Sequence, residues 1–247
     1  MQVGLFVTCL VDLMRPRIGF ATIKLLEQAG CTVVVPPQQT CCGQPGFNSG
    51  DRESGRAMAR RFLSDFEAFD YVVAPSGSCT GMIRCHYAEL FPEDPLLQAR
   101  LNALSARTYE LTQFLVDVLQ VEQVESTFAG TCTYHDSCSG LRELGIKQQP
   151  RALISGIPSA QLREMDKPEI CCGFGGTFSI KLGDIATRMA DNKCQDVVAT
   201  GADAIVGGDL GCLLNIEGRL RRMGDRQTRV LHVAEVLAGP EAEPEGD

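Results

Sequence analysis

The sequence has no dense basic cluster, and this absence excludes the common nucleic-acid-binding proteins. Its formal net charge is −8 and its pI is about 5.0. The densest basic stretch is Arg219–Arg222, which we interpret as a solvated helix end. Binding to a phosphate backbone needs a much larger concentration of Lys and Arg. We therefore expect no nucleic-acid partner.

The sequence also has no long apolar run. The apolar N-terminal residues are broken at Asp12, with no basic segment before them and no small-residue cleavage site after them. A bilayer span needs about 20 apolar residues, and a signal peptide needs the flanking segments that are missing here. We expect a cytoplasmic protein without a membrane span. In that reducing compartment, twelve cysteines indicate metal or redox chemistry rather than disulfide bonds.

Fingerprints of several enzyme classes are missing as well. We find no Gly-x-Gly-x-x-Gly after a predicted strand, no flavin or nicotinamide motif and no Ser–His–Asp arrangement. Gly173–Gly176 resembles a nucleotide loop only superficially, because the adjacent cysteines explain its glycines better. The sequence therefore identifies no catalytic residue.

What the sequence has in excess is cysteine in a repeated register. Cys-Cys-Gly occurs twice, and each doublet has a cysteine some thirty residues before it and another about forty after it. The step between the two copies is 129 residues for the first cysteine, 130 for the doublet and 133 for the last. Independent buried cysteines would not keep such a register, so we interpret it as a duplicated four-thiolate site. The two sets are Cys9, Cys41, Cys42 and Cys79, and Cys138, Cys171, Cys172 and Cys212.

Apolar segments alternate with amphipathic ones through the first half of the chain. Strands are predicted at Val3–Thr8, Thr32–Val35 and Tyr71–Ala74. We expect the strand at Thr32–Val35 to be buried. Helices are predicted at Arg17–Ala29 and Asp51–Phe66. Strands interleaved with helices favour βαβ units and a mostly parallel sheet.

The second half repeats this order of elements. Strands are predicted at Thr127–Tyr134, near Gln161–Met165 and at Ala204–Gly207, with a long helix at Asp184–Thr200. The closing segments, Arg107–Leu115 and Arg229–Leu237, each match a short strand followed by a helix.

We therefore predict an α/β fold of two tandem repeated lobes, each a mostly parallel sheet flanked by helices. The lobes are placed at residues 1–122 and 127–238, and an acidic disordered tail at residues 239–247.

The cysteines of the register lie where ligands gather in parallel α/β sheets. Cys9, Cys79, Cys138 and Cys212 follow predicted strands directly, and each doublet lies in a loop after another strand. The carboxyl ends of parallel strands share one edge, so the four sulfurs of each set can converge. Four thiolates suit an iron–sulfur cluster best. Zinc fits less well, since its structural sites favour compact ligand pairs, and unligated core or redox thiols are the third interpretation.

These motifs resemble the duplicated cysteine-rich (CCG) domain. That domain occurs in the B subunit of heterodisulfide reductase and in the iron–sulfur subunits of glycolate oxidase and anaerobic glycerol-3-phosphate dehydrogenase. This sequence lacks the ferredoxin-like Cys-x-x-Cys-x-x-Cys segment of the last two. With Thr8–Asp12, Tyr134–Cys138 and Cys171–Phe178, it is most similar to the lactate utilization protein A family. The two repeats cover nearly the whole chain.

The resemblance implies an iron–sulfur electron-transfer subunit of a multi-subunit system that oxidises L-lactate, a 2-hydroxyacid, to pyruvate. In that family three proteins are encoded together, so the implied partners are the other iron–sulfur and accessory subunits of a lactate oxidation complex. The chain would be a non-flavin oxidoreductase subunit, and it would associate peripherally with a membrane only through these partners.

One departure from the related proteins concerns a fifth cysteine. The heterodisulfide reductase version ends each motif with Cys-x-x-Cys, which gives five thiolates and non-cubane clusters that cleave a disulfide. Met82 and Asn215 stand at those positions here. Four cysteines per lobe imply an ordinary 4Fe–4S cluster, with one or two clusters per chain. The alternative functions are a heterodisulfide or thiol–disulfide reductase subunit with a catalytic cluster, and a metal-stapled scaffold without catalysis.

Four cysteines stand outside the register. Cys31 opens a predicted strand and Cys194 lies in a predicted helix, so we expect both to pack as small buried hydrophobes. Cys85 and Cys132 are alternative ligands, although Cys138 fits the repeat better than Cys132.

The histidines offer one candidate for a role at a site. His135, with Asp136, precedes Cys138 and is a candidate for contact with the metal ligands or for proton transfer. His86 follows Cys85 in a predicted helix, and we expect it to lie on the surface or to pack in the core. His232 aligns with Glu110 of the other lobe, so we expect no repeated role for it.

Overall fold

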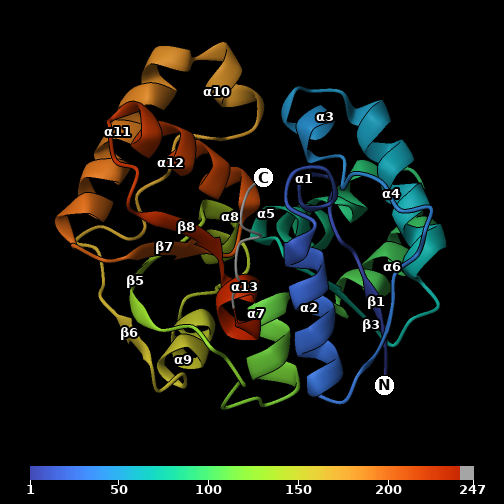
Figure 1. Ribbon diagram of the computed structural model, residues 1–247. Coiled ribbons are helices and arrows are strands. Elements are labelled where there is room, and N and C mark those ends of the chain that lie inside the picture. Colours follow the sequence, from blue (N-terminus) through green and yellow to red (C-terminus); the bar gives the residue numbers. More distant parts are fainter. Residues whose placement is uncertain (240–247) are drawn as a thin grey trace.

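The computed structural model describes residues 1–239, and residues 240–247 lie outside that part. It contains two four-stranded sheets in which the strands pair in parallel. The first lobe holds β1 (Gln2–Leu5), β2 (Thr32–Val34), β3 (Tyr71–Ala74) and β4 (Thr108–Glu110). The second holds β5 (Gly130–His135), β6 (Ala160–Leu162), β7 (Ala204–Gly207) and β8 (Arg229–His232). The predicted α/β fold of two tandem lobes is confirmed (Figure 1).

The strands follow the same order in both sheets, β2-β1-β3-β4 and β6-β5-β7-β8. Val3 of β1 lies opposite Val33 and Tyr71, and Cys132 of β5 lies opposite Leu162 and Ala204. The chain moves outward from β1 to β2 and then returns to the other side of β1 with β3. This reversal creates a topological switch point between β1 and β3, and another between β5 and β7.

The prediction that Thr32–Val35 is a buried strand is wrong. β2 is an edge strand, in which Thr32 is exposed, Val33 and Val34 are half-buried, and the following Val35 is exposed. A short run of β-branched residues suits an edge strand as well as a central one. Its burial depends on what packs over it, which the run itself does not specify.

The segments between the strands are mainly helical. In the first lobe they form α1 (Cys9–Met14), α2 (Arg17–Gln28), α3 (Gln44–Asn48), α4 (Arg52–Phe66), α5 (Gly77–Gly81), η1 (Met82–His86), η2 (Ala88–Leu90), α6 (Pro95–Ser105), α7 (Leu111–Gln113) and η3 (Phe114–Val118). In the second lobe they form α8 (Cys138–Arg142), α9 (Gln148–Ser155), α10 (Thr177–Lys181), α11 (Gly183–Ala199), α12 (Leu210–Arg222) and α13 (Val233–Ala238).

The long helices lie close to their predicted positions because their signals are local. α4 begins after Asp51, whose carboxylate caps the helix by accepting from the Ser54 amide at 3.0 Å. α2 buries Ile18, Leu25 and Leu26 on one face. The strand predicted from residue 127 begins only at residue 130 as β5. Its sequence is apolar enough for a strand throughout, but only the part beside β6 and β7 has partners.

Each lobe contributes its last helix to the packing of the other lobe. α13 lies against α2, and α7 with η3 lies against α9 (Figure 1). Lys24 Nζ of α2 donates to the Ala238 carbonyl oxygen of α13 at 2.7 Å. One hydrophobic core therefore includes residues of both lobes, such as Leu26 and Leu237, whereas a second core lies in the first lobe. The two sequence repeats thus share a core.

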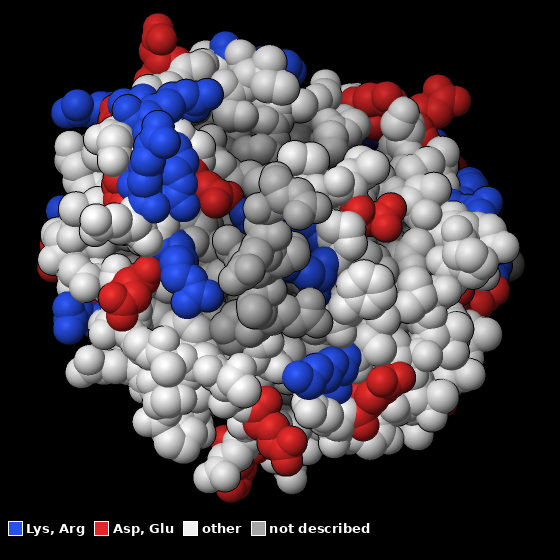
Figure 2. Space-filling view, in the orientation of Figure 1, with Lys and Arg blue, Asp and Glu red and all other residues white. Residues whose placement is uncertain are grey.

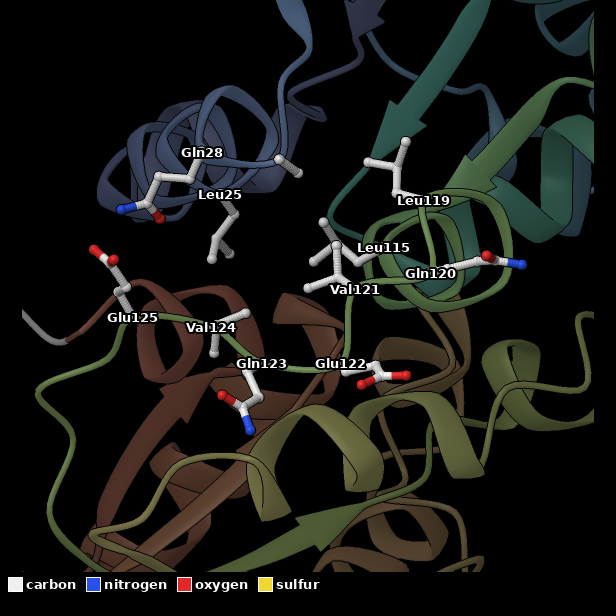
Figure 3. A pocket seen from close by; sticks show the side chains of 11 residues that line it. Leu25, Gln28, Leu115, Leu119, Gln120, Val121, Glu122, Gln123, Val124 and Glu125 are labelled. Carbon is white, nitrogen blue, oxygen red and sulfur yellow. The ribbon is translucent and has the colours of Figure 1, made fainter.

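The connection between the lobes, residues 120–129, forms no helix or strand. The Val121 amide donates to the Leu115 carbonyl oxygen at 2.9 Å, and Val121 and Val124 pack against the shared core. Figure 3 shows this connection beside Leu25 and Gln28 of α2, where it lines a groove. The division at residues 122–127 stays a prediction, and the predicted tail lies outside the described residues apart from its first residue.

None of the described helices combines the length and apolar character that a bilayer span requires. On the face in Figure 2, acidic and basic side chains are interspersed, apart from a basic group at the upper left near α11 and α12. In α12, Arg219 pairs with Asp191 and Arg221 pairs with Glu217. The basic helix end noted in the sequence is thus partly neutralised by carboxylates.

Candidate metal centres

The predicted ligands gather at the carboxyl ends of the strands. Cys9 and Cys138 are the first residues of α1 and α8, which follow β1 and β5. Cys79 and Cys212 lie in the first turns of α5 and α12, which follow β3 and β7. These four strands flank the two switch points, where parallel sheets open a crevice for ligands. We call Cys9, Cys41, Cys42 and Cys79 the first site, and Cys138, Cys171, Cys172 and Cys212 the second site.

Within each site, every cysteine sulfur lies close to that of the next cysteine along the chain. In the first site Cys9 Sγ lies 3.7 Å from Cys41 Sγ, Cys41 interacts with Cys42, and Cys42 interacts with Cys79. The second site has the same sequence of contacts, from Cys138 to Cys171, Cys172 and Cys212. The structure therefore brings together each set of four that the repeat predicts.

The crowding of sulfurs has a large electrostatic effect. Hydrogen bonds with Cys42 and Cys9 lower the pKa of Cys41 to about 2, while the hydrogen bond with Cys41 raises the pKa of Cys9. Adjacent thiolates repel one another. Four thiols this close together can therefore all lose their protons only when a metal cation takes the place of those protons. The donor set consists of four soft sulfurs per site, and it fits a metal cluster.

The glycine after each doublet is required by the loop's shape. Gly43 and Gly173 have φ angles of 81° and 85°, which favour glycine. Each amide donates to the first sulfur of its doublet, Cys41 or Cys171, at 3.4 Å. An N–H directed at sulfur stabilises the thiolate form. The Cys-Cys-Gly motif is therefore a local device for presenting a sulfur with an N–H donor.

The first site opens into a cavity of about 160 Å³ that the second lobe helps to close. Its walls include all four cysteines of the first site together with Phe174 and Asp209 of the second lobe. Phe174 packs against Gly211, where an added Cβ would come within 2.5 Å of the ring. The first site is thus built from both lobes.

Comparison with known proteins agrees with this geometry. The family model "Cysteine-rich domain" (CCG) matches residues 3–84 and 132–217. Lactate utilization protein A of Bacillus cytotoxicus is 46% identical over 237 residues, which cover 96% of this chain and 98% of that protein. The protein of the same name from Geobacillus kaustophilus is 47% identical, with 96% and 98% covered. This chain belongs to the lactate utilization protein A family. The resemblance predicted from the motifs is confirmed.

A solved structure supports the fold assignment of this family member. The crystal structure of a hypothetical protein from Helicobacter pylori matches 98% of the chain with a TM-score of 0.69. The sequences are 12% identical, and the chain spans 50% of the length of that protein. At this identity the likeness concerns the fold alone.

In this member of the lactate utilization protein A family, the two residues at the fifth-cysteine positions have other roles. Met82 is completely buried and belongs to the core of the first lobe. Asn215 Nδ2 donates to the Cys172 carbonyl oxygen at 2.8 Å. In the first lobe the Tyr87 hydroxyl donates to the equivalent Cys42 carbonyl oxygen at 2.9 Å. Asn215 thus anchors the doublet through its backbone.

The cysteines outside the register do not join either group of sulfurs. Cys31, Cys132 and Cys194 are buried, as expected for packing residues in the case of Cys31 and Cys194. Burial raises the pKa of Cys132 and of Cys194 to about 11. Cys85 is exposed on η1. The alternative that Cys85 or Cys132 serves as a spare ligand gains no support from these positions.

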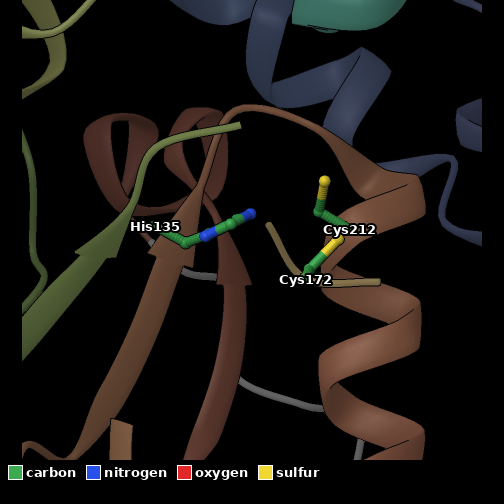
Figure 4. A group of neighbouring side chains, drawn as sticks. All are labelled: His135, Cys172 and Cys212. Carbon is green, nitrogen blue, oxygen red and sulfur yellow. The ribbon is translucent and has the colours of Figure 1, made fainter. Parts of the chain in front are cut away.

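His135 lies at the second site, as its position in the sequence suggested. One of its ring nitrogens and the sulfurs of Cys172 and Cys212 all lie within 4.8 Å of one another. Figure 4 shows the imidazole at the end of β5, directed toward these two sulfurs. Asp136 instead binds Arg151 with two contacts, at 2.8 and 2.9 Å. Only the first member of the His–Asp pair therefore faces the sulfurs.

The expectation that His232 has no repeated role is wrong. His232 Nδ1 accepts from the Ala234 amide at 3.1 Å and caps α13. In the first lobe, Glu110 Oε2 accepts from the Thr112 amide at 2.8 Å and caps α7. Both residues therefore begin the helix that packs on the opposite lobe. The alignment hid this role because an imidazole nitrogen and a carboxylate oxygen can both cap a helix.

Glu110 should make the stability of the protein depend on pH. Burial raises its pKa to about 7 from 4.5, although the contacts with Thr112 and Gln113 oppose the shift. The folded state thus holds the proton more tightly than the unfolded state, and stability falls as pH rises from 4.5 to 7. The expected loss is roughly 3 kcal/mol.

The variant Glu110→Gln should lack this loss. Its free energy of unfolding relative to the wild type should rise by roughly 3 kcal/mol between pH 5 and pH 8, as measured by urea unfolding. The exposed Glu125 provides the matched control, and Glu125→Gln should run parallel to the wild type. The prediction would be contradicted if the free energy of unfolding of Glu110→Gln changed with pH as that of the wild type does. The difference between the two proteins is the relevant quantity, since the buried histidines change the absolute curve in the opposite direction.

Sequence reasoning missed two residues near the sites, Asp209 and Lys193. Asp209 Oδ1 accepts from the Gly211 amide at 3.2 Å, while Oδ2 accepts from the Ser78 amide of the other lobe at 2.8 Å. Lys193 is fully buried near the second site. The cap position of Asp209 before α12 was recognisable, but its contact across the lobes was not. Lys193 lay in an amphipathic segment in which a lysine is normally exposed.

Proposed function

We propose that this protein carries electrons through iron–sulfur clusters in a multi-subunit system that oxidises L-lactate to pyruvate. The observation that carries the proposal is the pair of four-sulfur groups at the strand ends. The names of the relatives supply the substrate, since those proteins are called lactate utilization proteins and match over nearly their whole length.

The eight cysteines of the two sites are the proposed ligands. Four thiolates per site suit a 4Fe–4S cluster, which would supply one-electron transfer when bound. Zinc is the weaker candidate, because an adjacent cysteine pair is unlike the compact spacing of its structural sites. We propose up to two clusters per chain.

The chain's own residues would hold the sulfurs and limit their access to water. The Gly43 and Gly173 amides donate to the first sulfur of each doublet. Tyr87 and Asn215 fix the backbone carbonyls of the doublets. Hydrogen bonds to sulfur and solvent exposure are two of the factors that set the reduction potential of a cluster.

Oxidation of L-lactate to pyruvate releases two electrons and two protons. We propose that the chemistry on lactate takes place on partner subunits, iron–sulfur and accessory proteins of the same system, because no substrate-binding motif is found in this sequence. The electrons would leave toward an acceptor such as a quinone. Contact with a membrane would then be peripheral and made through the partners.

Electron transfer is preferred to disulfide reduction because a fifth thiolate is absent from each site. Asn215 directs its amide nitrogen to a backbone carbonyl oxygen, and Met82 is a core residue. Neither provides the additional thiolate on which the disulfide-cleaving relatives depend.

The test is anaerobic purification followed by iron and sulfide quantitation, EPR and a reduction assay. We expect about four iron and four sulfide per occupied site. L-lactate should reduce the clusters only after the partner subunits have been added. Reduction by lactate without partners would contradict the role as an intermediate carrier, and an iron-free protein would contradict the cluster itself. Reduction of a disulfide substrate by the isolated, prereduced protein would favour the reductase instead.

A further inference from the structure

The two sites differ in the residues that pack behind their sulfurs. In the first lobe, Phe6 at the end of β1 packs edge-on against Phe62 of α4, with ring centroids 5.2 Å apart. His135 takes the place of Phe6 in the second lobe, three residues before Cys138 as Phe6 is three before Cys9. The helix corresponding to α4 is α11, and it contributes Lys193. An apolar pair in one lobe is therefore matched by a polar pair in the other.

The His135 ring makes no hydrogen bond of normal geometry within residues 1–239. Its side chain is 1% exposed, and the polar group beside it is the backbone of Pro168, whose carbonyl oxygen already accepts from Lys193. A buried polar group without a partner is costly. The ring faces Cys172 and Cys212 (Figure 4), so a group held by these sulfurs is positioned to receive its N–H.

Lys193 places an amine near the cysteine doublet of the second site. It is completely buried, and Nζ donates to the carbonyl oxygens of Lys167 and Pro168 at 2.8 and 3.1 Å. No carboxylate in residues 1–239 lies within ion-pair distance of Nζ. Burial lowers its pKa from the usual value, and its charge interacts with Asp196 of α11 and then with Cys172 and Cys171.

Other charged groups also lie near the second site. Asp196 has a counterpart in the first lobe, because Asp65 follows Phe62 by three residues as Asp196 follows Lys193. Asp136 is paired with Arg151. Asp209 interacts with Cys138 and Cys212, but it also lines the cavity of the first site and accepts from Ser78 there. Asp209 thus opposes part of the effect of His135 and Lys193 on the second site.

We propose that His135 and Lys193 make the second site the more easily reduced of the two, so that electrons within the chain move from the first site to the second. This inference rests on the proposed function, since it assumes a cluster at each site. Reduction adds negative charge to a cluster. A nearby ammonium and an N–H donor to sulfur stabilise that charge, whereas Phe6 and Phe62 do not.

The experiment is an anaerobic potentiometric titration of the two-cluster protein followed by EPR. The variants Cys41→Ser and Cys171→Ser, each with one site disrupted, assign the two signals. The second site should have the higher midpoint potential. His135→Phe and Lys193→Met should each make its reduction at least tenfold less favourable, which is about 59 mV for one electron, and leave the first site unchanged.

Two further variants serve as controls. His135→Gln keeps an N–H donor and should retain part of the effect that His135→Phe removes. Lys181→Met removes an exposed lysine of the same lobe and should shift neither potential. Iron content and the thermal unfolding midpoint identify any variant that fails to fold or to bind its cluster.

The outcomes separate this inference from the proposed function. Two occupied sites with equal potentials, or a second site that keeps its potential in both His135→Phe and Lys193→Met, would overturn the inference and leave electron transfer intact. A wild-type protein without iron would overturn the proposed function, and the inference with it.

Discussion

Replacing Cys171 by serine should remove the iron of the second site, and replacing Cys41 should remove that of the first. The sulfurs of Cys41 and Cys171 each interact with two other cysteines of their site. Each also accepts a hydrogen bond from the amide of the glycine in its motif. A hydroxyl is a poor ligand for iron compared with a thiolate. We expect each variant to retain roughly half of the wild-type iron and sulfide and to lose one EPR signal.

The matched control is Cys31→Ser, which introduces the same hydroxyl at a buried cysteine outside both sites. It should retain the full iron content, with at most a modest loss of stability from the buried hydroxyl. Unchanged iron in both Cys41→Ser and Cys171→Ser would remove the doublets from the ligand set. Loss of all iron in either variant would instead mean that the two sites do not fill independently.

Replacing Gly173 by alanine should both destabilise the protein and disturb the second site. The backbone there has a φ of 85°, and an added Cβ would lie 2.5 Å from the Ala186 carbonyl oxygen of α11. The left-handed conformation costs about 1–2 kcal/mol for a residue with a side chain, and a core overlap costs about as much again. We expect a loss of roughly 3 kcal/mol in urea unfolding together with reduced iron content.

Gly30 provides the control for the backbone conformation alone. Its φ is 84°, but an added Cβ would meet no atom within 4 Å. Gly30→Ala should therefore cost only about 1–2 kcal/mol and leave the iron content unchanged. Equal losses in Gly30→Ala and Gly173→Ala would show that α11 yields to the added methyl group.

The exchange of terminal helices links the behaviour of the two lobes. Because α13 packs on α2 and η3 packs on α9, unfolding one lobe exposes apolar surface of the other. Asp209 adds a polar connection between the strand ends, where it caps α12 and accepts from the Ser78 amide. The structure therefore joins the lobes both through the shared core and beside the first site.

The sequence by itself determined the repeat, the fold class and the two sets of cysteines. Those features depend on local signals. A run such as Tyr71–Ala74 forms a strand, Asp51 caps a helix, and the register of the cysteines reports a duplication without any coordinates. Cys-Cys-Gly carries its own geometry, because Gly43 and Gly173 adopt a backbone conformation that other residues avoid.

The tertiary structure decided what surrounds each strand and each sulfur. The exposure of β2, the placement of Phe174 over the first site, and the burial of Lys193 all depend on residues far away in the chain. His135 became specific only when the ends of β5 and α12 placed it beside Cys172 and Cys212. Periodicity and spacing describe one segment at a time, whereas the surroundings of a sulfur are set by side chains that folding brings together from separate segments.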